Sequence, residues 1–186
     1  MSHAQGADGI KAAVRNGVRS IEHGIYLDDE GIELMLDRGA WLVPTLVAPR
    51  AVLEFADAGG NIAPEVLRKA QMVVEVHAEA VRRAVEAGVK IAMGTDSGVG
   101  PHGNNLDELR LMTECGMSPQ AALHAATGSA AELCGVADEL GTIAIGKRAD
   151  LTLFDGDVLD LVPKGGRAMR DAVRQVWIDG RPRLPV

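Results

Sequence analysis

Three side chains in this sequence have the chemistry of metal ligands and lie where predicted strands end. Asp96 follows a continuous apolar run over residues 89–93, which is too short for a helix and typical of a buried parallel strand. His23 follows a second short run over residues 18–22, and His3 would close a strand lying further upstream. The carboxyl ends of parallel strands share the face on which α/β proteins bind ligands. We therefore expect all three side chains to project from one face.

Two imidazoles and a carboxylate are ligands that Zn²⁺ accepts, and a metal with an open coordination position lowers the pKa of a bound water. Asp96 could bind this metal, accept a proton from the water, or do both. Each residue alone also fits an ordinary role, Asp96 as a helix cap or turn residue and each histidine as a satisfied polar residue. The coincidence of three such residues on one face favours the metal site.

The other histidines and one glycine-rich turn have weaker signals. His102 lies in the loop after Asp96, where it could contact substrate, whereas His77 and His124 fall within predicted helices and are expected to be structural. Residues 98–103 match a dinucleotide-binding pattern, which would indicate an oxidoreductase. That pattern also requires an acidic residue ending a second strand about 20 residues later, and here that position falls in a predicted helix. We expect the match to be accidental.

The elements that must position these residues alternate between helix and strand. The predicted order is helix 7–15, strand 18–22, helix 28–38, strand 41–46, helix 64–87 and strand 89–93. A loop is predicted between residues 46 and 64. Short connections of this kind imply a parallel sheet with helical crossovers. Three further helices follow, the first capped by Asn105 with Glu108 and the last by a capping box of Ser129 with Glu132.

The pattern changes to short strands from residue 141 onward. Strands are predicted at residues 149–154 and 172–178, and Asp179-Gly180 is typical of a two-residue hairpin turn. We expect an α/β portion over residues 1–140 and a small β-rich portion over residues 141–186.

Composition excludes several classes of partner. A chain of 186 residues that is 47% hydrophobic can bury the core of one domain with an appendage. The formal net charge of −7 and the lack of a basic block argue against nucleic acid or an anionic membrane as partner. No apolar run approaches the roughly 20 residues of a membrane span, and the first residues lack a signal-peptide pattern. We expect a cytoplasmic protein.

Several motifs resemble the C-terminal half of the metal-dependent amidohydrolase superfamily. The resemblance is greatest to the branch with Xaa-Pro dipeptidase-like, arginine/lysine carboxypeptidase-like and imidazolonepropionase-related enzymes. The matching motifs follow the family's order over nearly the whole chain: His3-Ala-Gln-Gly6, Ile21-Glu-His-Gly24, Pro44-Thr-Leu46, Gly94-Thr-Asp-Ser97, His102-Gly-Asn-Asn105, Ala126-Thr127 and residues 141–151.

This resemblance implies a fold and a set of roles. The fold would be part of a (β/α)₈ TIM barrel, comprising its last strands and helices, with a small C-terminal β-sandwich portion. His3, His23 and Asp96 would bind Zn²⁺ or another divalent metal after the fifth, sixth and eighth strands. Asp96 would also carry the proton from the attacking hydroxide to the leaving amine. By the same analogy, the candidate substrate contacts are Tyr26, Thr45 and His102.

The resemblance also implies parts that this chain lacks. No two of the five histidines are two positions apart, and no lysine ends a strand, so the family's His-x-His pair and metal-bridging lysine are missing. We expect a hydrolase of amide or peptide-like C–N bonds in a small amide or dipeptide substrate, incomplete and inactive alone. Exposed barrel edges favour self-association or pairing with an N-terminal half-barrel chain. The alternatives are an imidazolonepropionase-like cyclic amidase and a non-catalytic fragment that complements a partner chain.

Overall fold

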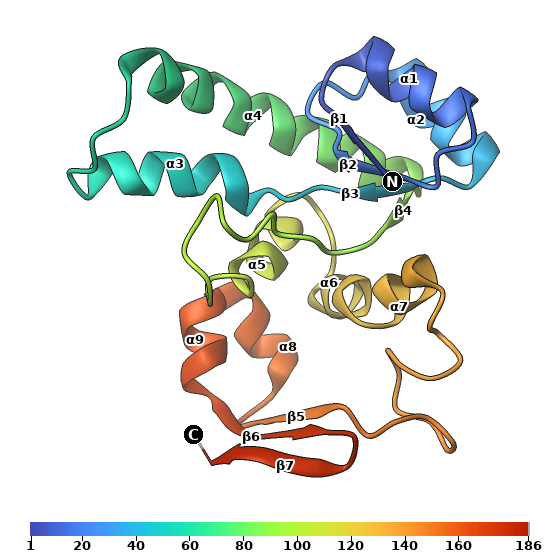
Figure 1. Ribbon diagram of the computed structural model, residues 1–186, viewed down its shortest axis with the longest axis vertical. Coiled ribbons are helices and arrows are strands. Elements are labelled where there is room, and N and C mark those ends of the chain that lie inside the picture. The colour runs from blue at the N-terminus through green and yellow to red at the C-terminus, as the bar shows by residue number, and fades with distance from the viewer. Residues whose placement is uncertain (186) are drawn as a thin grey trace.

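The computed structural model describes residues 1–185, and its first half is a parallel α/β unit (Figure 1). The four parallel strands lie in the order β1-β2-β3-β4. They are β1 (Ser2–Ala4), β2 (Ser20–His23), β3 (Trp41–Val43) and β4 (Lys90–Ile91), and the helices that connect them are α1 (Ala7–Arg15), α2 (Asp29–Arg38), α3 (Val47–Asp57) and α4 (Pro64–Ala87). The predicted α/β fold with helical crossovers is confirmed.

Local signals explain where two of these helices begin and end. The side chain of Asp28 caps α2 by accepting a hydrogen bond from the main-chain nitrogen of Gly31 at 2.8 Å. Helix α4 begins at Pro64, whose missing N–H costs nothing in the first turn, and ends at Gly88 in the left-handed conformation with φ of 84°. Both helices have the bounds that the sequence predicts to within one residue.

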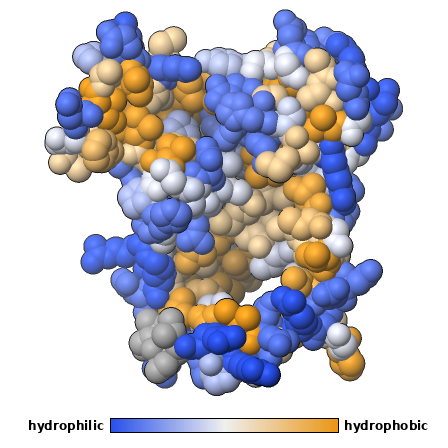
Figure 2. All heavy atoms as spheres, viewed as in Figure 1, coloured by the Kyte–Doolittle hydropathy of each residue, from blue (hydrophilic) through white to orange (hydrophobic). Residues whose placement is uncertain are grey.

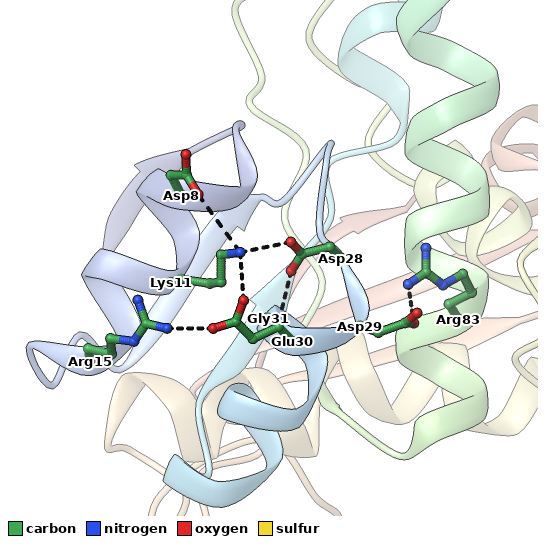
Figure 3. A network of polar contacts seen from close by, with 8 residues as sticks. All are labelled: Asp8, Lys11, Arg15, Asp28, Asp29, Glu30, Gly31 and Arg83. Atoms are coloured by element: carbon green, nitrogen blue, oxygen red, sulfur yellow. Dashed lines mark hydrogen bonds and ion pairs between the residues drawn. The ribbon is translucent and has the colours of Figure 1, made fainter.

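Charged side chains tie the helices around α2 together (Figure 3). The Lys11 ammonium of α1 donates to Asp28 at 2.9 Å and to Glu30 at 3.0 Å. These two hydrogen bonds raise the pKa of Lys11 above its usual range, and the bond to Asp28 has the larger effect. Arg83 of α4 reaches Asp29 from the other side. Helix α2, which follows His23 in the chain, is thus held by both of its neighbours.

The core of this unit lies around the two central strands. Ile21 of β2 and Leu42 of β3 are fully buried, together with Ile10 of α1 and Met35 of α2. These four side chains are apolar and lie between the sheet and the helices that cover it.

Truncation of Leu42 to alanine should destabilise the chain by about 2–5 kcal/mol, because it removes buried apolar surface and leaves a cavity under the central strands. Chemical denaturation with urea measures this change. Leu36→Ala is the matched control, since Leu36 is 44% exposed on α2 and its loss should cost less than about 0.5 kcal/mol. Equal losses in the two variants would contradict the assignment of this core.

Three local predictions about helices are wrong. Residues 47–57, expected to lie in a loop, form α3, whose first turn has no capping side chain of its own. Leu106 rather than Asn105 is the N-cap of α5 (Asp107–Glu114), and Glu108 bonds to α3 instead. Helix α6 is Pro119–Ala126, and α7 (Gly128–Cys134) follows it with Thr127 as N-cap. In place of a capping box, Ser129 contacts His124 and Glu132 contacts Lys90.

The C-terminal part is a three-stranded antiparallel sheet of β5 (Leu151–Phe154), β6 (Val173–Ile178) and β7 (Arg181–Pro185). The predicted hairpin turn is confirmed, with positive φ at Asp179 and Gly180. Between β5 and β6 the chain forms α8 (Val158–Leu161), η1 (Val162–Lys164) and α9 (Gly166–Asp171), none of which was predicted. Within residues 1–185 this part is one sheet with short helices and lacks the second sheet of a sandwich.

The C-terminal part is joined to the α/β unit through α5. The main-chain nitrogen of Gly166 donates to the Asp107 carboxylate at 2.8 Å, and Met169 of α9 is buried in the same core cluster as the sheet residues. Figure 2 shows hydrophobic residues lining a hollow between the two parts. The boundary expected between residues 140 and 141 stays a prediction. Among the helices of residues 1–185, none combines the length and apolarity that crossing a membrane requires.

Candidate active site

Three residues at the carboxyl ends of neighbouring strands share an unusual backbone conformation. His23 ends β2, Thr45 follows β3 and Asp96 follows β4, and their φ angles are 73°, 56° and 51°. Residues other than glycine rarely have positive φ, and such strain concentrates at functional sites. Within residues 1–185, the other non-glycine residue of this kind is Asp179 in the hairpin turn. The parallel strands therefore present three strained residues at one edge of the sheet.

The two histidines predicted as metal ligands are in contact. His3 was expected to close a strand lying further upstream, but it lies within β1 itself, and β1 pairs with β2 in parallel. This pairing places His23 Nε2 at 2.9 Å from His3 Nδ1, with the ring centroids 4.5 Å apart and the rings edge to face. His23 is buried whereas His3 is exposed. The expectation that both histidines project toward the same edge is consistent with this contact.

The hydroxyl of Thr45 assigns the tautomer of His23. Thr45 Oγ1 donates its one proton to the carbonyl oxygen of Pro44 at 2.6 Å. It can therefore only accept at its contact with His23 Nδ1, so Nδ1 carries the proton. The lone pair of Nε2 then faces His3. Burial and the neighbouring His3 lower the pKa of His23, which keeps the ring in the neutral form that binds metals.

His77 supports the backbone of His23 from α4. Its Nε2 donates to the carbonyl oxygen of His23 at 2.9 Å, and its side chain is 1% exposed. Burial lowers the pKa of His77 to about 4, so the ring is neutral. Its Nδ1 has no hydrogen-bond partner among the residues that the structure describes. The contact agrees with the structural role predicted for His77 and shows that His77 supports the main chain of His23.

Three of the remaining predicted site residues are exposed to solvent. Asp96 and His102 are exposed on the loop between β4 and α5, and Tyr26 is 46% exposed after β2. The charge of Asp96 acts to raise the pKa of His23, against the larger effects of burial and His3, so the carboxylate faces the same region. The Thr45 hydroxyl is occupied by His23 and Pro44. Substrate contact by Tyr26, Thr45 or His102 stays a prediction.

The donor set can be compared with what a metal ion requires. Two imidazole nitrogens on one tetrahedral zinc ion, each at about 2.0–2.1 Å, lie about 3.3–3.4 Å apart. The 2.9 Å between His23 Nε2 and His3 Nδ1 is shorter and is the length of a hydrogen bond between the two rings. In residues 1–185, however, no group of three or more His, Cys, Asp or Glu side chains is placed to hold a metal ion. The described residues thus suit a metal by the chemistry of their donors, two neighbouring imidazoles with Asp96 nearby.

Comparisons with known proteins match nearly the whole chain to one family. A model of the amidohydrolase family matches residues 1–183. The chain is 34% identical over 193 residues to ochratoxinase of Aspergillus niger, an alignment that covers 97% of this chain and 37% of that protein.

Two solved structures are similar in fold and sequence. A crystal structure of a Xaa-Pro dipeptidase with methionine bound in its active site has a TM-score of 0.85 and 39% identity, covering 97% of this chain and 43% of that one. A prolidase in complex with N-methylphosphonate-L-proline has a TM-score of 0.88 and 33% identity, covering 99% and 44%. The chain therefore spans less than half the length of these relatives. The family match over residues 1–183 shows that this chain belongs to the amidohydrolase family of enzymes.

Proposed function

We propose that this chain supplies part of an active site that hydrolyses amide or peptide-like C–N bonds with a divalent metal. The observation that carries the proposal is the His3–His23 pair, in which a neutral His23 held by Thr45 directs an unprotonated nitrogen at its neighbour. The ochratoxinase, dipeptidase and prolidase similarities support the same class of reaction.

A metal such as Zn²⁺ would be held by His3, His23 and Asp96, and when bound it would polarise the substrate carbonyl and acidify a water. The residues of this chain would then position and move protons. Thr45 keeps the proton of His23 on Nδ1, away from the ligand nitrogen. Asp96, exposed at the same edge, would take a proton at a carboxylate oxygen and pass it to the leaving amine.

The proposed substrate is a small amide or a dipeptide. Two similar structures are a Xaa-Pro dipeptidase and a prolidase in complex with a proline-based phosphonate, which makes dipeptides ending in proline the first substrates to test. Tyr26 and His102 are the side chains that would meet such a substrate, because both are exposed and they follow His23 and Asp96 in the chain. The imidazolonepropionase-like alternative stays a prediction.

We also propose that a second polypeptide segment completes the site. The described residues provide two contacting ligands rather than three or more, and β1 and β4 end the four-stranded sheet. A second copy of the chain or an N-terminal half-barrel chain would cover these sheet edges and add ligands. The same observation favours the second candidate function, a non-catalytic chain that complements a partner. A cytoplasmic location, proposed from the sequence, is compatible with either.

Metal content and native mass test the proposal together. The purified chain, loaded with Zn²⁺, should bind the metal in stoichiometric amounts, and His23→Ala should weaken binding at least about 100-fold because it removes a ligand. His124→Ala is the matched control, since His124 is exposed on α6 and contacts Ser129.

Hydrolysis of Xaa-Pro dipeptides and N-acyl amino acids is then measured for the chain alone and with an N-terminal half-barrel chain. Activity that Asp96→Asn abolishes would support the catalytic proposal. Zinc binding without activity in either mixture would favour the non-catalytic candidate. A chain that binds no zinc, or binds it equally well as His23→Ala, would contradict the metal site.

A further inference from the structure

A buried carboxylate on α5 holds the turn that carries Thr45. Glu108 is 0% exposed, and its two oxygens accept separate main-chain hydrogen bonds. One comes from the nitrogen of Leu46 at 2.9 Å and the other from the nitrogen of Val47 at 2.8 Å. Leu46 is the N-cap of α3 and Val47 is its first residue, so Glu108 satisfies N–H groups that a helix start leaves unpaired.

The Thr45 hydroxyl is the nearest local group that could have capped α3, and it is used elsewhere. With φ of 56° at Thr45, the hydroxyl contacts Pro44 and His23 instead of the helix that follows. A turn in which Thr45 serves His23 therefore leaves the start of α3 without its own capping side chain. Glu108, from 61 residues further along the chain, takes over that task.

Capping a helix with a buried carboxylate has a large cost in free energy. Burying a carboxylate costs several kcal/mol unless it is well paired, and among the ion pairs of residues 1–185 none includes Glu108. A serine or aspartate at the N-cap is the ordinary way to satisfy N–H groups of a helix start from within the same segment. Glu108 instead links α5 to the strained turn beside His23.

We propose that Glu108 is a positioning residue of the active site. By holding the main chain of Leu46 and Val47, its carboxylate keeps the Thr45 hydroxyl on His23 Nδ1 and so determines which nitrogen of His23 carries the proton. The effect on metal binding rests on the function proposed above, whereas the effect on the His23 tautomer does not.

The tautomer of His23 is the direct test, read from the ¹⁵N shifts of its imidazole by NMR on the full chain without metal. At a pH where the rings are neutral, wild type should show the proton on Nδ1, and Glu108→Gln should move a large fraction of it to Nε2. Thr45→Val should give the same change, and Thr45→Ser should restore the wild-type signal. Glu114→Gln is the control, because Glu114 ends the same helix at the surface and pairs with Arg110.

A second substitution guards against a variant that does not fold. Glu108→Met removes the buried charge while keeping the side chain's size, a change that buried sites often accept. A folded Glu108→Met or Glu108→Gln variant that keeps the proton on Nδ1 would overturn the proposal. Zinc affinity is measured in parallel and should fall about 10-fold or more in both variants. If wild type binds no zinc, the proposed function fails, while the tautomer result still decides the role of Glu108.

Discussion

Replacement of Glu108 by glutamine should raise the free energy of unfolding, relative to wild type, by about 3 kcal/mol as pH increases from 4.5 to 7. Burial raises the pKa of the Glu108 carboxyl from its ordinary 4.5 to about 7, against the opposing effect of the Leu46 and Val47 N–H groups. In this window the folded wild type binds a proton that the unfolded chain has lost. The contribution of Glu108 to wild-type stability therefore falls as pH rises, and glutamine, which does not titrate, removes that fall.

Urea unfolding of both proteins across this pH window measures the difference. Glu114→Gln makes the same chemical change at an exposed position of α5. It should leave the pH dependence of the free energy of unfolding as in wild type. Parallel curves for wild type and Glu108→Gln would mean that the carboxyl does not bind a proton on folding. The comparison concerns the slope with pH, so a constant loss of stability in the variant would not obscure it.

Replacement of His77 by glutamine should have the opposite dependence. Burial lowers the pKa of His77 from its ordinary 6.5 to about 4, so between these values the unfolded chain binds a proton that the folded chain does not. Wild-type stability should therefore fall by about 3 kcal/mol from this residue as pH decreases through the window, and His77→Gln should not show that loss. Glutamine can still donate to the His23 carbonyl, which preserves the contact that His77 makes.

The double variant Glu108→Gln/His77→Gln provides the check on this second prediction. Between pH 4.5 and 6.5 the two groups act in opposite directions, so their contributions to the wild-type trend nearly cancel. Each single variant should therefore show a slope that wild type lacks, of opposite sign, and the double variant should return to the wild-type trend. A His77→Gln curve parallel to wild type would show that His77 is protonated equally in the folded and unfolded chains.

Much of the fold could be predicted because its signals are local. Asp28 and Gly39 mark the ends of α2, Pro64 and Gly88 mark those of α4, and Asp179-Gly180 marks the hairpin. In each case the residue that ends the element acts on the backbone within a few positions. Helix α3 was missed for the opposite reason, since its start is satisfied by Glu108 from a distant helix. The same long-range bond explains why Glu108 does not form the cap predicted with Asn105.

The sequence by itself determined which residues could do chemistry at the site and on which edge of the sheet they would lie. His23 and Asp96 were found because their residue types suit metal ligands and each follows a predicted strand, and these strands are parallel in one sheet with β3 between them. Only the tertiary structure decided that His23 carries its proton on Nδ1 and that Thr45 holds it there. The partners of a buried polar group depend on what packs against it, and no spacing in the chain specifies that.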